Sequence, residues 1–345
     1  MLIEFNNSNY HQSQFEKFIK RLGDKHVNAA NHNPFSYYAD HSVMDLKRWV
    51  LISNKEIVGS VLIKKQKYII CGKNKDVYFI KYPVTLGNVD NKYKNTGALL
   101  MTSIAQRFPL SFGLGMGGVQ SKIAKIFRVM GYKLIKIPFY FKPISYLGLA
   151  FKNPYLVNLF GSNIKSETKS IHTFINKSME VREVDLLENN KYWIQCSFSL
   201  KRDLKLLNSQ VPKRNPNFRK FLIKTTDQII GSFCVFESKP RKHKYFGNLN
   251  LWTILDADMV FDTNAGRNFN IGITKIAKLN NIDVIICNHS NKKFHEFSNR
   301  NGWYSIKSNF AIALSPFLAK EIQQFENMNI TRLDGDGPIG LGGNV

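Results

Sequence analysis

An internal repeat is the sequence feature that most limits how this chain can fold. Three landmarks of the first half recur in the second half at an almost constant offset of 171 or 172 residues. They are KEIVGSVLI at 55–63 and DQIIGSFCV at 227–235, Thr102-Ser-Ile-Ala105 and Thr274-Lys-Ile-Ala277, and Gly131-Tyr132 and Gly302-Trp303. Landmarks that share one register predict two copies of the same structural unit.

Each copy combines apolar strand patterns with amphipathic helix patterns. The last part of the first copy predicts a strand at 77–86, a helix at 97–107, a strand at 110–114, a helix at 121–130 and a strand at 133–141. This alternation, after an antiparallel run of strands, indicates an α/β class with a mixed sheet in each copy. We expect domains at 1–142 and 180–316, an interdomain helix and linker at 143–179, and a C-terminal helix and tail at 317–345.

The charge balance narrows the choice of partners. Among 345 residues, 49 Lys+Arg outnumber 25 Asp+Glu, which gives a formal net charge of +24 at pH 7. Such a surface attracts nucleic acid, anionic lipid or phosphorylated small molecules, and composition alone does not choose among them. A content of 43% hydrophobic and 21% charged residues excludes a disordered or collagen-like chain.

The sequence shows no targeting, membrane or disulfide signal. No secretory signal opens the chain, and no apolar run reaches the roughly 18 residues of a membrane span. We therefore expect a cytoplasmic protein without stable membrane insertion. The cysteines Cys71, Cys196, Cys234 and Cys287 lie far apart, without a CxxC pair, so we expect neither a zinc site nor a disulfide framework.

One loop of the first unit has the composition of an anion site. After the strand at 77–86 the chain carries Lys94-Asn-Thr-Gly97, and then a helix begins. Backbone N–H groups and the positive end of the helix dipole would surround an anion there, and Gly97 would let a pyrophosphate approach closely. The same four residues are also typical of an ordinary turn and helix start.

The order and spacing of three segments resemble the GNAT acyltransferase superfamily. The segments are 56–63, 89–97 and 121–132. Members of this family bind acyl-coenzyme A, and their loop Arg/Gln-x-x-Gly-x-Gly/Ala wraps its pyrophosphate. Lys94 and Gly97 match the first two positions of that loop, whereas Leu99 replaces its last small residue. The resemblance implies a coenzyme site in the first unit.

The resemblance also implies roles for individual residues. The set expected to hold the coenzyme is Thr85, Leu86, Gly87, Lys94, Asn95, Thr96, Gly97, Ala98 and Ser121. In the family the fourth and fifth strands splay apart, and Pro83 suits such a gap because it cannot donate to a sheet ladder. Amides near 85–87 would then bind the thioester carbonyl oxygen. Phe127 stands where the family often has a thiolate-protonating Tyr, so that Tyr is absent.

We assign the second unit to the acceptor. Its counterpart of the coenzyme loop, Arg267 to Gly272, has Asn270 in place of the first Gly, although Arg267 and Gly272 keep the family spacing. Basic residues at 201–220 suit a nucleotide diphosphate, because arginine binds phosphate with two parallel hydrogen bonds. The residues expected to bind the acceptor are Arg202, Lys213, Arg214 and Arg219. An exposed basic loop is the alternative explanation.

Transfer to an amine requires a base, because an ammonium ion has no lone pair with which to attack a thioester. Asp256 and Asp258 end one predicted strand of the second unit, and His289 ends the next. His289 would titrate near neutral pH, and either carboxylate could orient it or act itself. Asp40 and His41, in a loop of the first unit that resembles the acceptor-side loop of the family, are the second choice.

The C-terminal segment from Thr331 to Gly340 contains Asp334-Gly-Asp336-Gly. This pattern hints at calcium, but it lacks the third acidic position and the closing Glu of an EF-hand loop, so we expect no metal site. Similar endings occur in tandem GNAT proteins of bacterial surface-polysaccharide synthesis, which the whole chain resembles.

These features suggest a tandem-GNAT N-acyltransferase. It would move an acetyl or short hydroxyacyl group from coenzyme A to the amine of a dTDP-linked amino-dideoxy sugar for O-antigen, lipopolysaccharide or capsule. The amine would attack the thioester directly in a ternary complex. Acyl-coenzyme A would be a co-substrate and no cofactor would be tightly bound. We expect a monomer or weak dimer without a nucleic-acid partner.

Two alternatives remain open at this point. A Fem-type aminoacyl transferase shares the doubled fold, but such proteins usually carry a coiled-coil insertion for tRNA, and no heptad run is present here. A nucleic-acid-binding protein would explain the charge, and it would show steep salt dependence and no coenzyme binding.

Overall fold

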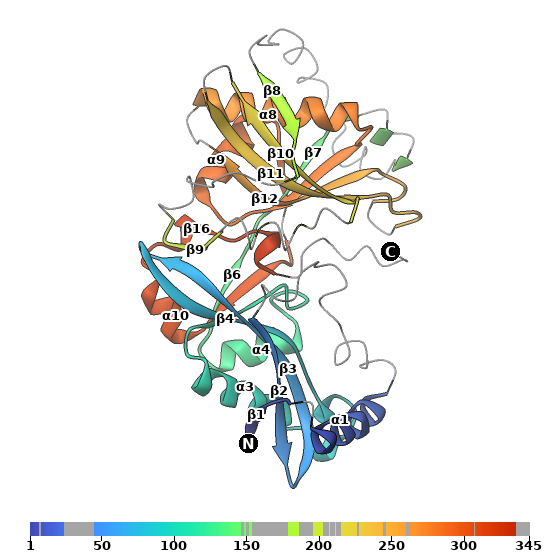
Figure 1. Ribbon diagram of the computed structural model, residues 1–345, viewed down its shortest axis with the longest axis vertical. Helices are drawn as coiled ribbons and strands as arrows, with labels where there is room; N and C mark the ends of the chain where they lie inside the picture. The colour runs from blue at the N-terminus through green and yellow to red at the C-terminus, as the bar shows by residue number, and fades with distance from the viewer. Residues whose placement is uncertain are drawn as a thin grey trace. The chain divides into compact units, whose positions relative to one another are not determined.

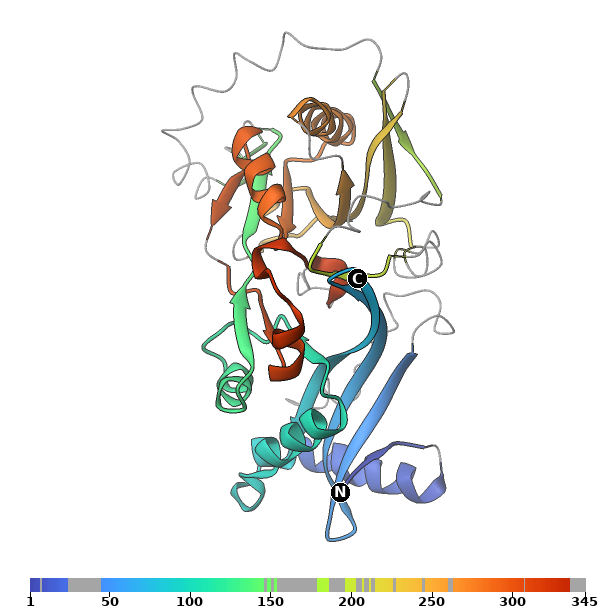
Figure 2. The ribbon, with the colours of Figure 1, turned by 90° about the vertical axis from the view of Figure 1, so that its left-hand side faces the viewer.

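The computed structural model describes residues 1–6, 8–23, 45–145, 148–149, 152–153, 179–185, 196–202, 207, 211, 215–225, 228–243, 246–259, 263–306 and 308–335. These residues form two compact units, each with its own mixed sheet and flanking helices (Figure 1; Figure 2). The α/β class with a mixed sheet in each unit is confirmed. No helix in the described ranges is both long and apolar enough to cross a membrane.

The first unit comprises 1–137, 197–201 and 308–325. Its sheet follows the order β1-β2-β3-β4-β5-β15-β6, and β9 also pairs with β3. The strands are β1 (Leu2–Glu4), β2 (Asp45–Ser53), β3 (Glu56–Ile70), β4 (Lys73–Thr85), β5 (Ser111–Leu114), β6 (Lys133–Lys136), β9 (Phe198–Leu200) and β15 (Ala311–Leu314). The helices are α1 (Asn9–Leu22), α3 (Thr96–Arg107), α4 (Lys122–Val129) and α10 (Pro316–Glu321), with 3-10 turns η3 (Leu86–Asn88) and η4 (Asn91–Tyr93).

The second unit comprises 138–196, 202–307 and 326–345. Its sheet follows the order β14-β7-β13-β12-β11-β10-β8. The strands of this sheet are β7 (Phe139–Pro143), β8 (Glu180–Glu183), β10 (Phe218–Lys224), β11 (Ile229–Ser238), β12 (Leu251–Met259), β13 (Val284–Asn288) and β14 (Tyr304–Ile306). The two-residue strand β16 (Met328–Asn329) is not part of it. The helices are α8 (Thr263–Leu279) and α9 (Lys292–Arg300), with a 3-10 turn η9 (Arg332–Asp334).

The two units take strands from both halves of the chain. The predicted strand at 133–141 is two strands, because the chain leaves the first unit between Ile137 and Pro138. β7 then lies between β13 and β14 in the second unit, whereas β15 lies between β5 and β6 in the first. The expected domains at 1–142 and 180–316 are each continuous in sequence, so they do not include this exchange of strands between the units.

Corresponding bulges in the two sheets bear out the internal repeat. The pairing of β3 with β4 shifts between Ser60 and Leu62, which leaves one extra residue in β4 near Tyr82 and Pro83. The pairing of β11 with β12 shifts in the same way and leaves Leu255 extra in β12, 172 residues after Pro83. Such bulges bend a strand and increase its twist. Both units therefore bend the same strand at the same place.

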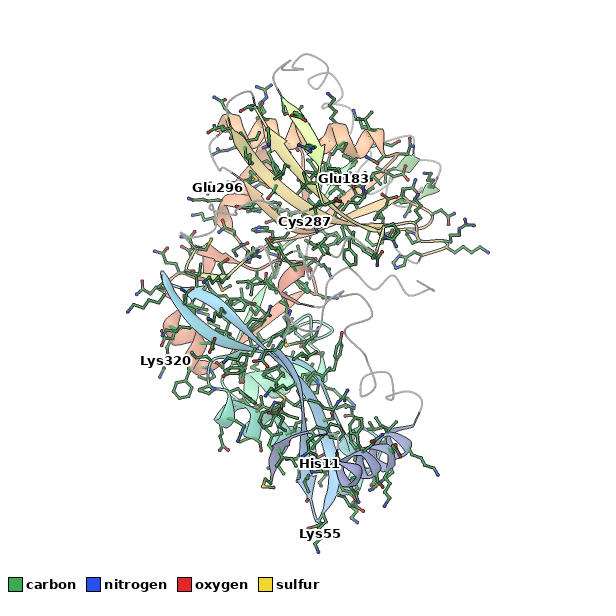
Figure 3. All side chains as sticks on the ribbon, viewed as in Figure 1. His11, Lys55, Glu183, Cys287, Glu296 and Lys320 are labelled. Atoms are coloured by element: carbon green, nitrogen blue, oxygen red, sulfur yellow. The ribbon has the colours of Figure 1, made fainter. Side chains whose placement is uncertain are left out.

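Each sheet has an apolar core of its own. In the second unit, Trp252, Phe221, Phe233 and Phe269 are buried against one another, and Cys287 lies in the same core, within the sheet (Figure 3). By contrast, Lys55 lies at the exposed tip of the hairpin that joins β2 to β3. The helices α3 and α8 each follow the bulged strand of their unit, as the repeat predicts.

Candidate functional site

A strand opening lies at the centre of the first sheet. β4 runs parallel to β5 from Tyr78 opposite Ser111 to Ile80 opposite Gly113, and the described pairing between them ends there. β4 continues beside β3 up to Thr85, whereas β5 continues beside β15. The two strands therefore diverge after Ile80. This confirms the splay expected near Pro83.

Phe127 of α4 lies where the opening begins. An added Cβ on Gly113 would lie 2.8 Å from Cζ of Phe127 and 2.9 Å from Cε2, closer than real side-chain contacts allow. The Phe127 ring is buried and packs against Tyr132, whose hydroxyl hydrogen-bonds the Ser111 hydroxyl at 3.1 Å. The position expected to lack a proton-donating Tyr is thus occupied by a buried apolar ring.

The helix that follows β4 begins beside this opening without a side-chain cap. Asn95, the residue before α3, makes no capping hydrogen bond, and the first turn of α3 carries no acidic residue. The first N–H groups of any helix lack acceptors within the helix and carry partial positive charge. In contrast, α1, α4, α9 and α10 are capped by their own side chains, from Ser8, Ser121, Asn291 and Ser315.

Small residues bring the loop close to this helix start. An added Cβ on Gly87 would lie 2.5 Å from the carbonyl oxygen of Tyr93, so only glycine fits there. The same oxygen accepts a hydrogen bond from the Thr96 hydroxyl at 2.6 Å. An added Cβ on Gly97 would meet only Ile126 at 3.7 Å and Thr85 at 3.9 Å, ordinary contacts. A Cβ at Gly97 would therefore be tolerated by the neighbouring side chains at the first turn of α3.

The expected coenzyme residues divide into two groups. Thr85, Thr96 and Gly97 lie together at the start of α3, and Asn95, Ala98 and exposed Lys94 are on the same segment. Two others are occupied elsewhere: the Leu86 side chain belongs to the apolar core, and the Ser121 hydroxyl caps α4 by accepting from the Ala124 amide at 3.1 Å. Their side chains are therefore not available to a coenzyme.

Arg21 of α1 contacts the loop between β4 and α3. Its guanidinium contacts the Glu56 carboxylate at 3.1 Å and the Asp90 carboxylate at 3.7 Å, and it lies 4.9 Å from the ring centre of Tyr93. The Tyr93 hydroxyl also donates to Glu56 at 3.4 Å. We call Arg21, Glu56, Asp90 and Tyr93 the loop clamp. It fixes Tyr93, whose carbonyl oxygen accepts the hydrogen bond from Thr96. The sequence pattern did not predict this cluster.

The second unit has the corresponding strand opening. β12 runs parallel to β13 up to Ile254 opposite Cys287, after which the described pairing between them ends. Here a segment of the same chain lies at the opening: Thr331 forms a bridge with His289, and Ile330 exchanges hydrogen bonds with Ser290. This segment follows β16 and reaches the opening from the C-terminal part of the chain.

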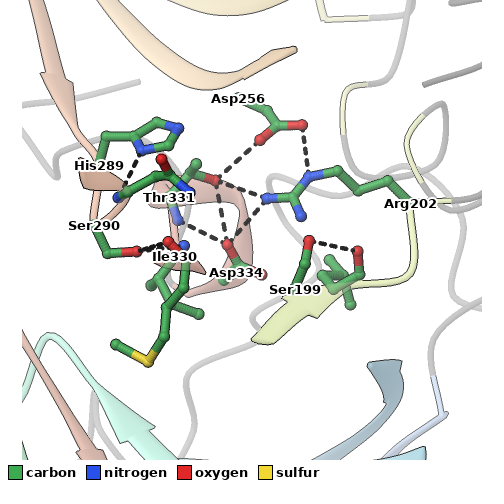
Figure 4. Close-up of polar contacts among 11 residues, drawn as sticks. Ser199, Arg202, Asp256, His289, Ser290, Ile330, Thr331 and Asp334 are labelled. Carbon is green, nitrogen blue, oxygen red and sulfur yellow. Dashed lines mark hydrogen bonds and ion pairs between the residues drawn. The ribbon is translucent and has the colours of Figure 1, made fainter. Parts of the chain in front are cut away.

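A buried ion network joins that segment to β12 (Figure 4). The Arg202 guanidinium donates to Asp256 at 2.7 Å and to Asp334 at 3.2 Å, with side-chain exposures of 2%, 3% and 0%. The Thr331 hydroxyl bridges the two carboxylates, at 3.2 Å from each. Burial of this kind requires that charges be paired.

These contacts correct the roles we expected for Arg202 and Asp256. An arginine already shared by two buried carboxylates does not offer its guanidinium to a nucleotide diphosphate. The Asp256 carboxylate is buried and already accepts hydrogen bonds from Arg202 and Thr331, so it does not face a substrate amine. Asp258 is also buried on β12. In the second unit, Asp256 therefore acts as a structural anion.

His289 is held inside the second unit as well. Its side chain is fully buried, its Nδ1 accepts from the Asn291 amide at 3.2 Å, and its ring stacks on Phe294 with centres 4.2 Å apart. Burial, and then the nearby Arg202 charge, lowers the pKa of His289 well below its usual value. The imidazole is therefore neutral at pH 7, with Nδ1 already occupied, unlike the base titrating near neutral pH that we expected.

The structure also corrects the roles expected for Arg219 and for the segment from Arg267 to Gly272. Arg219 pairs with Glu183 at 2.7 Å and donates to Asn280 at 2.6 Å, so its guanidinium is engaged within the protein. Arg267 to Gly272 lies inside α8 rather than in a loop. An added Cβ on Gly272 would lie 2.9 Å from Ile223, so this glycine serves helix packing.

Four expected site residues fall outside the described residues: Asp40, His41, Lys213 and Arg214. In contrast, Thr331 and Asp334, which were not among the expected site residues, form a capping box at η9. The spacing Thr331-x-x-Asp334 is a recognised signal of that motif and could have identified the pair. Asp334 thus serves the ion network.

Solved structures with the same fold as this chain are known. No family model matches the sequence, and no curated protein matches it. A probable N-acyltransferase from Enterococcus faecalis V583 aligns with a TM-score of 0.55 at 8% identity, over 92% of this chain and 72% of that one. A GCN5-related N-acetyltransferase from Anabaena variabilis ATCC 29413 aligns with a TM-score of 0.56 at 11% identity, over 91% and 72%. Saccharomyces cerevisiae N-myristoyltransferase with bound myristoyl-CoA aligns at 0.47 and 10% identity, over 91% and 81%. The chain has the mixed α/β fold of the GCN5-related N-acetyltransferases, present in two units.

Proposed function

We propose that the protein is an acyl-coenzyme A-dependent N-acyltransferase whose donor site lies in the first unit. The observation that carries this proposal is the start of α3, which has no side-chain cap and lies beside the β4/β5 opening. An anion at that helix start would meet unpaired amides and the positive end of the dipole. The pyrophosphate of coenzyme A has the matching charge.

The first unit supplies binding and orientation for the reaction. The open turn at Gly97 admits the pyrophosphate, and exposed Lys94 adds a positive charge at the rim. The end of β4 beyond its pairing with β5, up to Thr85, would hold the thioester, with an amide donating to its carbonyl oxygen as negative charge develops. The amine nitrogen then attacks the carbonyl carbon, the C–S bond breaks, and the thiolate leaves.

The proton transfers need groups other than those first expected. The amine must lose a proton before or during attack, and the thiolate gains one. Because Phe127 has no ionisable group and Asp256 and His289 are held within the second unit, we propose Asp40 or His41 as the base. Asp40→Asn or His41→Asn should then lower turnover by about 10²–10⁴-fold at neutral pH, with less loss at higher pH.

As acceptor we propose a nucleotide-linked amino sugar, with a dTDP-linked amino-dideoxy hexose as the specific candidate. The support is the net charge of +24, which attracts a polyanion, and the resemblance carried by the sequence motifs. Since Arg202 and Arg219 are engaged with carboxylates, we assign the diphosphate contact to Lys213 and Arg214.

Separate titrations of the full chain with coenzyme A and with dTDP test both parts. We expect each to bind, at independent places, and a DNA duplex to bind more weakly at physiological salt. Absence of coenzyme binding would overturn the acyltransferase proposal. Coenzyme binding without dTDP binding would overturn only the nucleotide-sugar acceptor and would favour another amine, including the aminoacyl-transferase alternative.

A further inference from the structure

The openings of the two units differ in what fills them. In the first unit, β4 and β5 part after Ile80 and Gly113; in the second, β12 and β13 part after Ile254 and Cys287. We propose that residues 330–335 are a built-in filling of the second opening, so that each chain carries one coenzyme site instead of two. The stoichiometry rests on the proposed function, whereas the filling rests on contacts within the second unit.

The segment contacts both walls of the opening. On the β13 side, the Ser290 amide donates to the Ile330 carbonyl at 3.1 Å, and the Ile330 amide donates to the Ser290 hydroxyl at 2.8 Å. On the β12 side, the Thr331 hydroxyl donates to Asp256 at 3.2 Å. On the β13 side, these backbone positions are where a sheet partner would otherwise bind, and the chain supplies that partner itself.

Charge pairing makes the segment difficult to displace. Asp334 accepts from the Thr331 amide at 2.8 Å and from Arg202 at 3.2 Å, and the Arg332 guanidinium donates to Asn288 at 2.9 Å. A ligand that entered the opening would have to remove Asp334 from buried Arg202 and leave that charge without one of its two partners. Loss of one member of a buried ion network is strongly unfavourable.

The connection from the bulged strand to the following helix is also shorter in the second unit than the proposed pyrophosphate loop of the first. Ten residues separate Thr85, the last of β4, from Thr96, the first of α3, whereas three separate Met259 from Thr263. At the repeat offset of 172, the first residue of α3 corresponds to Asn268, which is already inside α8. This difference points independently to one coenzyme per chain.

Native mass spectrometry with coenzyme A, together with hydrogen exchange, tests the inference on the full chain. We expect one coenzyme per wild-type chain and none on Gly97→Val. In hydrogen exchange, the amides of Ser290, Ile330 and Thr331 should be protected in the wild type. Two bound coenzymes, or rapid exchange at these three amides while β12 and β13 stay protected, would overturn the filling.

Two variants and a control make the exchange test specific. Asp334→Ala removes the carboxylate, and Thr331→Val removes the hydroxyl with little change of volume, so the second remains informative if the first unfolds. Both should speed exchange at Ser290 and Ile330 by at least tenfold, while Glu296→Ala, an exposed change on α9, should leave it unaltered (Figure 3). Unchanged exchange in Thr331→Val would contradict the role of the network. No coenzyme on the wild type would overturn the proposed function alone, since the exchange results stand without it.

Discussion

The ring of Phe127 occupies the space that a side chain on Gly113 would need, with Cζ only 2.8 Å from the position of an added Cβ. Gly113 is the last β5 residue that pairs with β4, so this contact lies where the two strands begin to diverge. The aromatic ring and the glycine therefore form one packing unit at the edge of the candidate donor site.

Gly113→Ala should destabilise the first unit, because the new methyl group overlaps a buried ring. Overpacking of this kind costs about 1–3 kcal/mol of unfolding free energy. Urea unfolding of the full chain measures it. Phe127→Leu in the same chain should recover part of the loss, and equal stability of Gly113→Ala and wild type would contradict the contact.

Gly97→Val should weaken coenzyme binding without unfolding the protein. The added Cβ would meet Ile126 and Thr85 at 3.7 and 3.9 Å, which is ordinary contact, while the branched side chain would enter the open turn at the helix start. We expect the KM for acyl-coenzyme A to rise at least tenfold, with the melting temperature nearly unchanged.

Gly272→Val is the matched control in the second unit. Its added Cβ would lie 2.9 Å from Ile223, so it should lower the melting temperature and leave the KM near the wild-type value. The reverse pattern, a raised KM in Gly272→Val alone, would move the donor site to the second unit.

Arg21→Ala should loosen the loop clamp. Because Arg21 contacts Glu56, Asp90 and the Tyr93 ring, its loss frees the loop that orients Thr96. The KM for acyl-coenzyme A should rise several-fold while kcat stays near the wild-type value, and Arg21→Lys should restore part of the affinity. Lys47→Ala, which breaks an exposed pair with Glu4, should change neither constant.

Arg202→Met should be far more destabilising than Arg219→Met. The first change leaves Asp256 and Asp334 buried without their cation, which costs about 3–5 kcal/mol. Arg219 is partly exposed, and its main partner Glu183 is half exposed, so its removal should cost about 1 kcal/mol or less. Chemical denaturation of both variants at pH 7 separates the two outcomes, and similar losses would contradict the buried network.

His289 should make the protein sensitive to acid. The unfolded chain takes up a proton on this residue below about pH 6.5, whereas burial keeps the pKa of the folded imidazole well below that value. His289 therefore does not change the unfolding free energy above about pH 6.5. Below that pH the unfolding free energy falls, by up to about 1.4 kcal/mol per pH unit. His289→Asn, whose side chain can still accept from the Asn291 amide, should lose less stability between pH 7 and pH 5 in urea titrations. Parallel pH profiles for the two proteins would show that His289 does not titrate in this way.

The sequence alone determined the doubled α/β fold, because repeats, strand patterns and helix patterns are local properties. The spacing from Lys94 to Gly97 predicted the start of α3, and Pro83 predicted the divergence of β4 from β5. These signals depend on residues near one another in the chain, so the first unit's candidate donor site could be found without a structure.

Only the tertiary structure decided which strand joins which sheet and which charges pair. An apolar pattern shows that β7 and β15 are strands, but the choice of sheet depends on contacts with distant segments. In the same way, Arg202 meets Asp334 across 132 residues of chain, and no local spacing encodes that meeting. Among the described residues of the second unit, Arg202 and Asp256, which suggested phosphate binding and catalysis, form an ion pair with each other, and Arg219 pairs with Glu183. A buried charge is stable only beside a partner of opposite charge.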